Sequence, residues 1–213
     1  MSKIRVVGWL LVMVLLVHSS AALAEFDLSL FKNDSRFKVT EDKMNDTAVI
    51  VLADGGSVWG FANNSSSDEA ILVDVDIKLT SHELFPHSMI RISVYFIGEE
   101  WVSTDSFIVR TEKNRYTFKE LNSDRDINQG KSVEHFVVPI TDKSLPMIKE
   151  IINSSSSVDC RLSGDRYVDI PIAFRDIKNL QALYDTYIAA GGLDQDFSNV
   201  NALYPVTVKS MTD

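Results

Sequence analysis

The sequence lacks the cysteine pairs that stabilise many small exported domains. Cys160 is the single cysteine among 213 residues, so no disulfide can form within the chain. The sequence also lacks an internal repeat, a long linker and any apolar run long enough to span a bilayer. We therefore expect one domain that is stabilised by its hydrophobic core.

Residues 1–24 have the pattern of a cleavable secretory signal peptide. Two basic residues and no acidic one precede an apolar segment, residues 6–17, that is interrupted by a single glycine. Ala22 and Ala24 then stand at the −3 and −1 positions of a signal peptidase site. We expect cleavage after Ala24 and a periplasmic or secreted protein without a lipoprotein anchor. The alternatives are an uncleaved membrane anchor or a buried N-terminal helix.

The composition is acidic. The 21 lysines and arginines stand against 30 aspartates and glutamates, which gives a formal net charge of −9. Residues 1–24 hold two of those basic residues and no acidic one, so their removal leaves 189 residues with a formal charge of −11. A surface of this sign argues against nucleic acid or anionic lipid as a partner. We expect an unknown protein or envelope component as the partner, and no stable membrane anchor.

Alternating apolar and polar residues predict a β-rich domain over residues 25–192. The clearest strands are residues 70–80 and 89–97, in which every second side chain is apolar. Shorter strand-like runs are residues 47–53, 58–62, 101–111, 116–119, 133–140, 158–162 and 168–172. The turn signal at residues 54–56 predicts that the first two of these runs pair as a hairpin.

Two later segments have the spacing of amphipathic helices. Residues 141–153 place apolar side chains on one face, with Ser144 as the N-cap. Residues 176–190 carry a second apolar stripe that ends at Gly191. Residues 193–213 form a polar tail with slight β character. The fold expected is mainly β, an antiparallel β-sandwich or bent sheet of about eight strands with two late α-helices.

The register of one predicted hairpin follows from matching its two faces. A two-residue turn would pair Cys160 with Asp169, which places a core position opposite a charge. A three-residue loop at residues 164–166 instead pairs Cys160 with Ile170. The same loop places Arg161 opposite Asp169 on the solvent-exposed face, where opposite charges are favourable. We therefore predict the three-residue loop.

Two polar clusters have residues suited to metal binding but not the spacing. His82 and His87 are five residues apart and flank Pro86, so they cannot form the helical histidine pair of a zinc peptidase. Asp74 and Asp76 share one side of a strand, a placement typical of a solvated face.

A third cluster lies in a predicted loop. Asp124, Asp126 and Asn128 alternate before Gly130, but no glutamate follows at the spacing of a calcium-binding loop. We therefore predict no metal ligand, no cofactor and no cofactor-binding residue.

The remaining candidates are a thiol, a histidine and four aromatic residues. Cys160 falls on the predicted core face of its strand, which favours an inert buried thiol. His135 has no partner that the sequence identifies. The aromatic residues would suit a recognition surface but lie in strand-like runs, which favours core packing: Trp59, Phe61, Tyr95 and Trp101. The sequence has neither a nucleophile-elbow serine nor a glycine-rich phosphate loop.

Three short tracts together resemble exported bacterial β-rich domains of unknown function. They are Asp-Lys-Met at residues 42–44, Ile-Gly-Glu-Glu-Trp-Val at residues 97–102, and Cys-Arg-Leu-Ser-Gly at residues 160–164 leading to Tyr-Val-Asp at residues 167–169. The resemblance covers most of residues 37–188. It implies a β-rich fold and export, and it transfers no active site.

We expect an exported, non-catalytic binding or interaction module whose ligand the sequence does not identify. One alternative is a hydrolase whose catalytic residues the sequence does not reveal, and another is an accessory envelope protein without a small ligand. We predict no catalytic residue. A pocket in which Asp74, Asp76 or His82 converged with another titratable group would favour the hydrolase.

Overall fold

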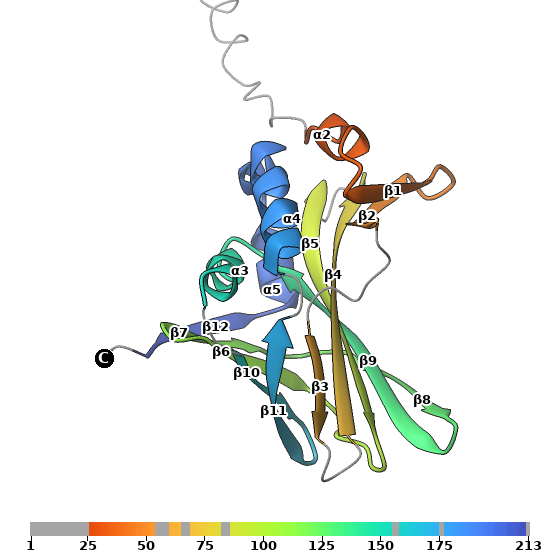
Figure 1. Cartoon of the computed structure of the whole chain (residues 1–213), viewed down its shortest axis with the longest axis vertical. Helices are drawn as coiled ribbons and strands as arrows, with labels where there is room; N and C mark the ends of the chain where they lie inside the picture. Colours follow the sequence, from red (N-terminus) through yellow and green to blue (C-terminus); the bar gives the residue numbers. More distant parts are fainter. Residues whose placement is uncertain are drawn as a thin grey trace, which may run out of the picture.

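Twelve strands form two antiparallel sheets in the part of the chain that the structure describes (Figure 1). The computed structural model describes residues 26–53, 60–64, 69–81, 86–154, 158–174 and 177–211. The strands are β1 (Phe37–Asp42), β2 (Thr47–Leu52), β3 (Gly60–Asn64), β4 (Glu69–Thr80), β5 (Ser88–Gly98), β6 (Ser106–Arg110), β7 (Asn114–Phe118), β8 (Asp124–Asn128), β9 (Lys131–Ile140), β10 (Val158–Ser163), β11 (Tyr167–Phe174) and β12 (Val206–Ser210). The helices are α2 (Ser29–Lys32), α3 (Leu145–Ile152), α4 (Ile177–Ala189), the 3-10 helix η1 (Gly192–Asp194) and α5 (Ser198–Leu203). The expectation of a mainly β fold with late helices is confirmed.

The first sheet is built around the two long strands, β4 and β5. They pair along almost their whole length, and β9 and then β8 continue the sheet beyond β5. On the other side of β4, β3 pairs with residues 69–73 and β2 pairs with residues 77–80. The predicted hairpin between residues 47–53 and 58–62 is therefore wrong. The two short strands lie side by side along one edge of β4, and their other edges pair with β1 and with β11, so neither has an edge left for the other.

The second sheet has the strand order β12-β7-β6-β10-β11. Strand β11 joins the two sheets, since Tyr167 to Ile172 pair with β10 and the last two residues pair with β3. The predicted three-residue loop is confirmed: Cys160 pairs with Ile170, and Arg161 pairs with Asp169.

One continuous hydrophobic core lies between the sheets and under the late helices. The inner face of β4 and β5 contributes a run of buried side chains: Ile71, Val73, Val75, Ile77, Ile90, Ile92, Val94 and Phe96. Helix α4 lies beside the upper part of β5, while the second sheet crosses the lower part (Figure 1). The hydroxyl of Tyr187, on α4, donates a hydrogen bond to the carbonyl oxygen of Ser88 at 3.2 Å. This bond fixes the helix to the start of β5.

The capping residues of the late helices lie where the sequence predicts them. Ser144 occupies the N-cap of α3, and a proline stands in the first turn. The Ser144 hydroxyl accepts a hydrogen bond from the Thr141 amide at 2.9 Å instead of capping a helical amide. Gly191 follows α4 with a φ of +88°, a conformation that glycine adopts without strain. None of the helices in the described part of the chain is long and apolar enough to cross a membrane.

Several elements at the edges of the sheets were predicted only weakly or not at all. Strand β8 was expected as a loop, but it pairs with β9 as an edge strand whose five residues are all exposed. Residues expected as a polar tail contribute α5 and β12, and Val200 of α5 is fully buried. Backbone pairing holds such strands without burying their side chains, so they leave no alternating pattern in the sequence.

A short crossover, residues 99–105, carries the chain from the first sheet into the second. Glu134 on β9 is fully buried and accepts three backbone hydrogen bonds from this crossover. Its carboxylate oxygens lie 2.5 Å from the Val102 nitrogen, 2.7 Å from that of Ser103 and 2.8 Å from that of Thr104. The carboxylate thus supplies the acceptors that a buried, irregular backbone needs.

The loop between β10 and β11 holds the crossover from the other side. The Asp165 amide donates to the Val102 carbonyl oxygen at 2.9 Å. Arg166 donates to the carbonyl oxygens of Trp101, at 3.2 Å, and Glu100, at 3.0 Å. A Cβ atom on Gly164 would lie 2.2 Å from the Ser103 carbonyl oxygen, so this loop needs glycine at residue 164 to approach so closely.

Replacing Glu134 by glutamine should destabilise the protein strongly. The amide nitrogen of Glu134→Gln turns a donor toward backbone groups that are themselves donors, so we expect a loss of about 2–4 kcal/mol in the free energy of unfolding. Urea denaturation followed by circular dichroism measures this loss. Glu112→Gln, at an exposed position, is the matched control and should change stability little. Equal stability of the two variants would contradict the assigned role of Glu134.

Replacing Gly164 by alanine should be more costly than the same change at Gly130. Gly164→Ala forces backbone atoms of the crossover apart, and we expect a loss of about 3 kcal/mol. Gly130 has open space around it but a φ of +81°, so Gly130→Ala should cost only about 1 kcal/mol. Thermal or urea unfolding of both variants tests the order. The opposite order would show that the contact between the two loops is unimportant.

Candidate functional site

The two carboxylates on β4 that were considered as metal ligands both accept hydrogen bonds within the protein. Arg91 on β5 binds Asp76 through two hydrogen bonds of 2.7 Å each. Asp74 accepts the Val75 amide at 2.8 Å. Among the described residues, no group of three histidine, cysteine, aspartate or glutamate side chains is placed to hold a metal ion. Asp124 and Asp126 lie on the exposed strand β8.

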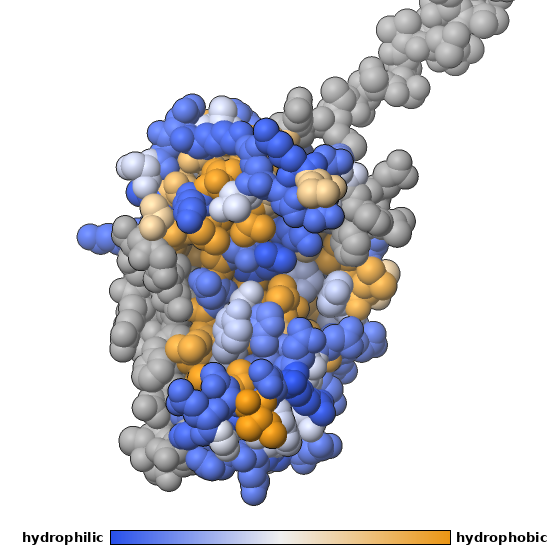
Figure 2. All heavy atoms as spheres, turned by 90° about the vertical axis from the view of Figure 1, so that its right-hand side faces the viewer, coloured by the Kyte–Doolittle hydropathy of each residue, from blue (hydrophilic) through white to orange (hydrophobic). Residues whose placement is uncertain are grey.

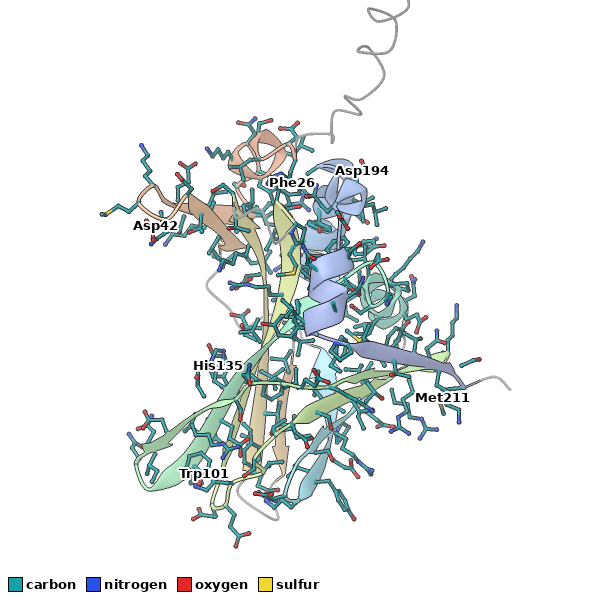
Figure 3. All side chains as sticks on the ribbon, turned by 180° about the vertical axis from the view of Figure 1, so that it is seen from behind. Phe26, Asp42, Trp101, His135, Asp194 and Met211 are labelled. Atoms are coloured by element: carbon teal, nitrogen blue, oxygen red, sulfur yellow. The ribbon has the colours of Figure 1, made fainter. Side chains whose placement is uncertain are left out.

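Neither of the two described histidines forms an ion pair with a carboxylate that the structure describes, although Asp124 on β8 is directly opposite His135. His135 stacks on Tyr95, with 4.3 Å between the ring centroids, on the face of the sheet turned away from the helices (Figure 3). His87 is exposed, and its Nδ1 lies 3.4 Å from the Thr80 carbonyl oxygen. His82 lies outside the described residues.

The single cysteine is buried as the sequence predicts. Cys160 is 5% exposed and lies on the core face of β10 with Val158 and Leu162. Burial, reinforced by the charge of Asp159, raises the pKa of the Cys160 thiol far above its usual value. The thiolate needed for nucleophilic chemistry is therefore strongly disfavoured at neutral pH.

The four aromatic candidates do not form one recognition surface in the described part of the chain. Tyr95 is 37% exposed beside His135, and Trp101 is half-buried in the crossover. Trp59 and the side chain of Phe61 lie outside the described residues.

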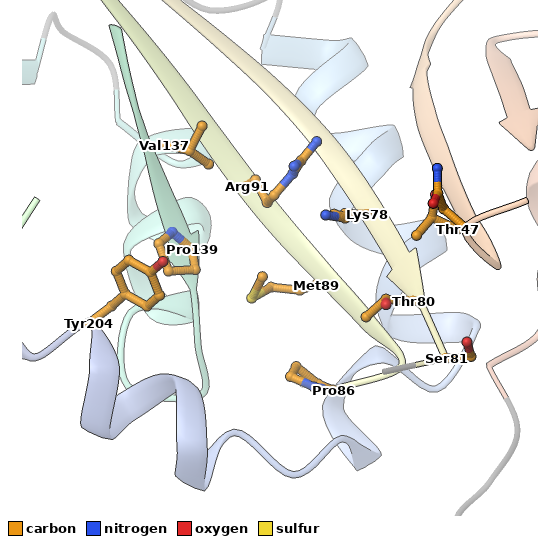
Figure 4. A pocket seen from close by; sticks show the side chains of 11 residues that line it. Thr47, Lys78, Thr80, Ser81, Pro86, Met89, Arg91, Val137, Pro139 and Tyr204 are labelled. Atoms are coloured by element: carbon orange, nitrogen blue, oxygen red, sulfur yellow. The ribbon is translucent and has the colours of Figure 1, made fainter. Parts of the chain in front are cut away.

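A hollow of about 510 Å³ lies on the outer face of the first sheet, over β2, β4, β5 and β9 (Figure 4). Its lining mixes two cations with apolar side chains and short polar ones: Lys78, Arg91, Met89, Pro86, Val137, Pro139, Tyr204, Asn45, Thr47, Thr80 and Ser81. Because Asp76 neutralises Arg91, Lys78 alone contributes an unbalanced charge there. The corresponding side of the molecule shows apolar groups scattered among polar ones (Figure 2).

A second hollow, of about 620 Å³, lies beside the turn between β1 and β2. Phe26, Leu28 and Leu79 give it an apolar floor, while Glu41 and Asp46 stand at its border. Its lining also includes Asp42, Lys43 and His87, so three carboxylates, a lysine and a histidine border this hollow. No ion pair joins His87 to a carboxylate that the structure describes.

The outer face of the second sheet carries a third hollow, of about 480 Å³, which we call the basic groove. It crosses β12, β7, β6, β10 and β11. Its lining comprises four cations, two acids, three apolar residues and the single cysteine: Arg110, Arg115, Arg161, Lys209, Asp159, Asp169, Ile108, Pro171, Met211 and Cys160. Met211 follows β12 at the edge of the molecule (Figure 3).

Strand register places three of these cations in one row. Lys209 on β12 is directly opposite Arg115 on β7, and Arg115 is directly opposite Arg110 at the end of β6. All three are exposed, and none forms an ion pair with any acidic side chain that the structure describes. Neighbouring strands lie about 4.8 Å apart, so like charges directly opposite one another repel. The row is thus a concentration of unbalanced positive charge.

The acids of the groove only partly offset this charge. Asp169 binds Arg161 through contacts of 2.5 and 2.6 Å, and Arg161 lies 4.8 Å from the centre of the Tyr167 ring. The Arg161 guanidinium lowers the pKa of the Asp169 carboxyl. Asp159 is opposite Arg110 in register, yet the two side chains make no ion pair. Only Arg161 is therefore neutralised by direct contact.

Hydrogen bonds to α3 fix the turn between β6 and β7 and so position the two arginines on either side of this turn. Glu150 on α3 accepts hydrogen bonds from the Thr111 hydroxyl at 2.6 Å and the Asn114 amide at 2.6 Å. It also accepts the Tyr116 hydroxyl at 3.0 Å. A helix under the sheet thus holds the hairpin that presents Arg110 and Arg115.

The chemistry of the basic groove is that of anion recognition. Guanidinium groups bind carboxylate or phosphate through two parallel hydrogen bonds, and lysine adds a point charge. No sequence motif marks this site, because Lys209 is distant along the chain from the two arginines and only the strand register brings the three cations together. The basic pair around the tight turn, Arg110 and Arg115, was the one local signal.

The basic groove has more cations than acids in its lining, in a chain whose formal net charge is −9. Comparison of the chain with protein-family models, with curated proteins and with solved structures finds no match.

Proposed function

We propose that the chain is an exported, non-catalytic binding module whose basic groove contacts an anionic partner in the cell envelope. The observation that carries the proposal is the row of Lys209, Arg115 and Arg110 on three adjacent strands, where none of the three cations forms an ion pair with an acidic side chain that the structure describes. A ligand that brings carboxylate or phosphate groups relieves the repulsion within this row.

The charge of the rest of the molecule supports a local mode of recognition. An acidic protein repels long polyanions such as nucleic acid at a distance. A ligand with a few anionic groups can instead reach the groove and bind the arginines at short range. The apolar residues Ile108, Pro171 and Met211 line the same groove, so a ligand that is partly apolar is favoured.

The proposal that the protein is not a catalyst rests on reactive side chains that are each buried, stacked or bound by a neighbour. Cys160 is buried, His135 is stacked on Tyr95, and Asp76 is bound by Arg91. Cys160 borders the basic groove, but its thiol is buried, and neither His135 nor Asp76 lines that groove.

Removing the row of cations should remove anion binding. We expect the triple variant Arg110→Gln, Arg115→Gln and Lys209→Gln to bind a fluorescein-labelled hexaglutamate peptide at least about tenfold more weakly than the unmodified protein, measured by fluorescence anisotropy at low salt. The binding constant of the unmodified protein should fall as salt rises.

The matched control removes the same number of exposed cations elsewhere. The variant Lys38→Gln, Arg125→Gln and Lys143→Gln carries the same net charge and should bind the peptide almost as the unmodified protein does. Equal losses in both triple variants would show that net charge alone attracts the peptide, and would contradict a groove-specific site.

Export should be visible in the mass of the protein. When the full-length chain is produced in a bacterial host, we expect protein recovered from the periplasm or medium to begin at Glu25, as determined by intact-mass spectrometry. Replacing Ala22 by lysine should block cleavage, because the −3 position of the site requires a small residue. Recovery of the intact 213-residue chain as the main species outside the cytoplasm would contradict cleavage after Ala24.

A further inference from the structure

Strand β12 forms one end of the sheet order, and no strand that the structure describes pairs with its outer edge. We infer that this edge binds an extended polypeptide segment of the partner, in which acidic and apolar residues alternate. The inference rests on the proposed function of the basic groove, because the row of cations begins on this strand. It adds a class of ligand and a mode of binding to that proposal.

The hydrogen bonds around β12 show which of its backbone groups are free. The Lys119 amide donates to the Pro205 carbonyl oxygen at 3.2 Å, and the Met211 amide donates to that of Lys113 at 2.8 Å. In an antiparallel pair, residues that face the neighbour alternate with residues that face away. Since residues 205 and 211 face β7, the amide and carbonyl groups of Val206 and Val208 face outward.

The two faces of β12 differ in the same alternating way. Thr207 and Lys209 lie on the side of the basic groove, opposite Thr117 and Arg115. Val208 lies on the other side, opposite Tyr116, and remains 42% exposed. A strand added at this edge therefore meets a cation at one position and an apolar side chain at the next.

This pattern specifies the sequence of the added strand. A residue directly opposite Lys209 has its Cβ about 5 Å away, so an acidic side chain there forms a cross-strand ion pair. Arg115, one strand further in, adds a second cation within reach of a long acidic side chain. An apolar residue opposite Val208 covers its exposed surface, and the alternation fixes the register of the pair.

The charge on the edge argues against a second copy of this chain as the occupant. Edge strands that carry lysine and follow proline resist pairing with their own kind, and β12 has Lys209 and comes directly after Pro205. Two β12 strands paired with each other would also bring the two rows of cations together. An acidic strand from another protein meets neither obstacle.

The test uses the unlabelled protein and fluorescein-labelled peptides that contain Val-Glu-Val-Glu-Val. In the paired state, the valine amides face Val206 and Val208, while the glutamate amides face solvent. We expect N-methylation of the valine amides to weaken binding at least about tenfold, since it removes two main-chain hydrogen bonds. N-methylation of the glutamate amides should leave the dissociation constant within about twofold of that of the parent peptide.

A peptide of the same composition with its glutamates and valines in separate blocks is the second control, and it should bind more weakly than the alternating peptide. Equal binding of both N-methylated peptides and of the block peptide to the unmodified protein would show that strand addition is wrong. If the groove triple variant then fails to bind all three peptides, the groove proposal stands. If the triple variant binds every peptide as the unmodified protein does, the groove proposal itself fails.

Sedimentation of the protein without peptide completes the test. We expect a monomer. A dimer that Val208→Lys disrupts would overturn the inference, because a second copy would then occupy β12.

Discussion

The two sheets depend on one buried carboxylate. The chain must leave the first sheet after β5 and enter the second at β6, and it does so through irregular backbone in which Val102 and Thr104 are buried. Glu134 supplies acceptors for three amides of that backbone, and the loop at Gly164 closes on it from the other side. Without these contacts, the crossover would carry unsatisfied amides into the core, and the sheets would lose their relative placement.

Sequence patterns predicted the strands that have one buried face and one exposed face. Strands β4 and β5 were evident from strict alternation, and the pairing of β10 with β11 followed from matching core positions and opposite charges. Strand β8 was not, because backbone pairing at an edge leaves its exposed side chains without a period, and for β12 the sequence indicated only slight β character. The predicted hairpin between β2 and β3 was wrong because a turn signal is local, whereas both edges of each strand pair with other strands: β1 and β4 flank β2, and β4 and β11 flank β3.

The basic groove could not be predicted for a related reason. Arg110 and Arg115 are close along the chain, but Lys209 comes from the end of the sequence, and no motif links it to them. Only the register of β12 on β7 sets the three side chains in a row. The metal and catalytic motifs considered in the sequence were local patterns, while the candidate site is a property of how distant strands are ordered.

Strand β11 belongs to both sheets, and this has a mechanical consequence. A partner strand lying along β12 would pull parallel to the ladder, so tension on it would load several hydrogen bonds in shear at once instead of opening them one by one. The load would pass through β7, β6 and β10 to β11, and from there into the first sheet. A module built in this way can serve as a tether, because force applied at its edge is shared by its whole framework of strands.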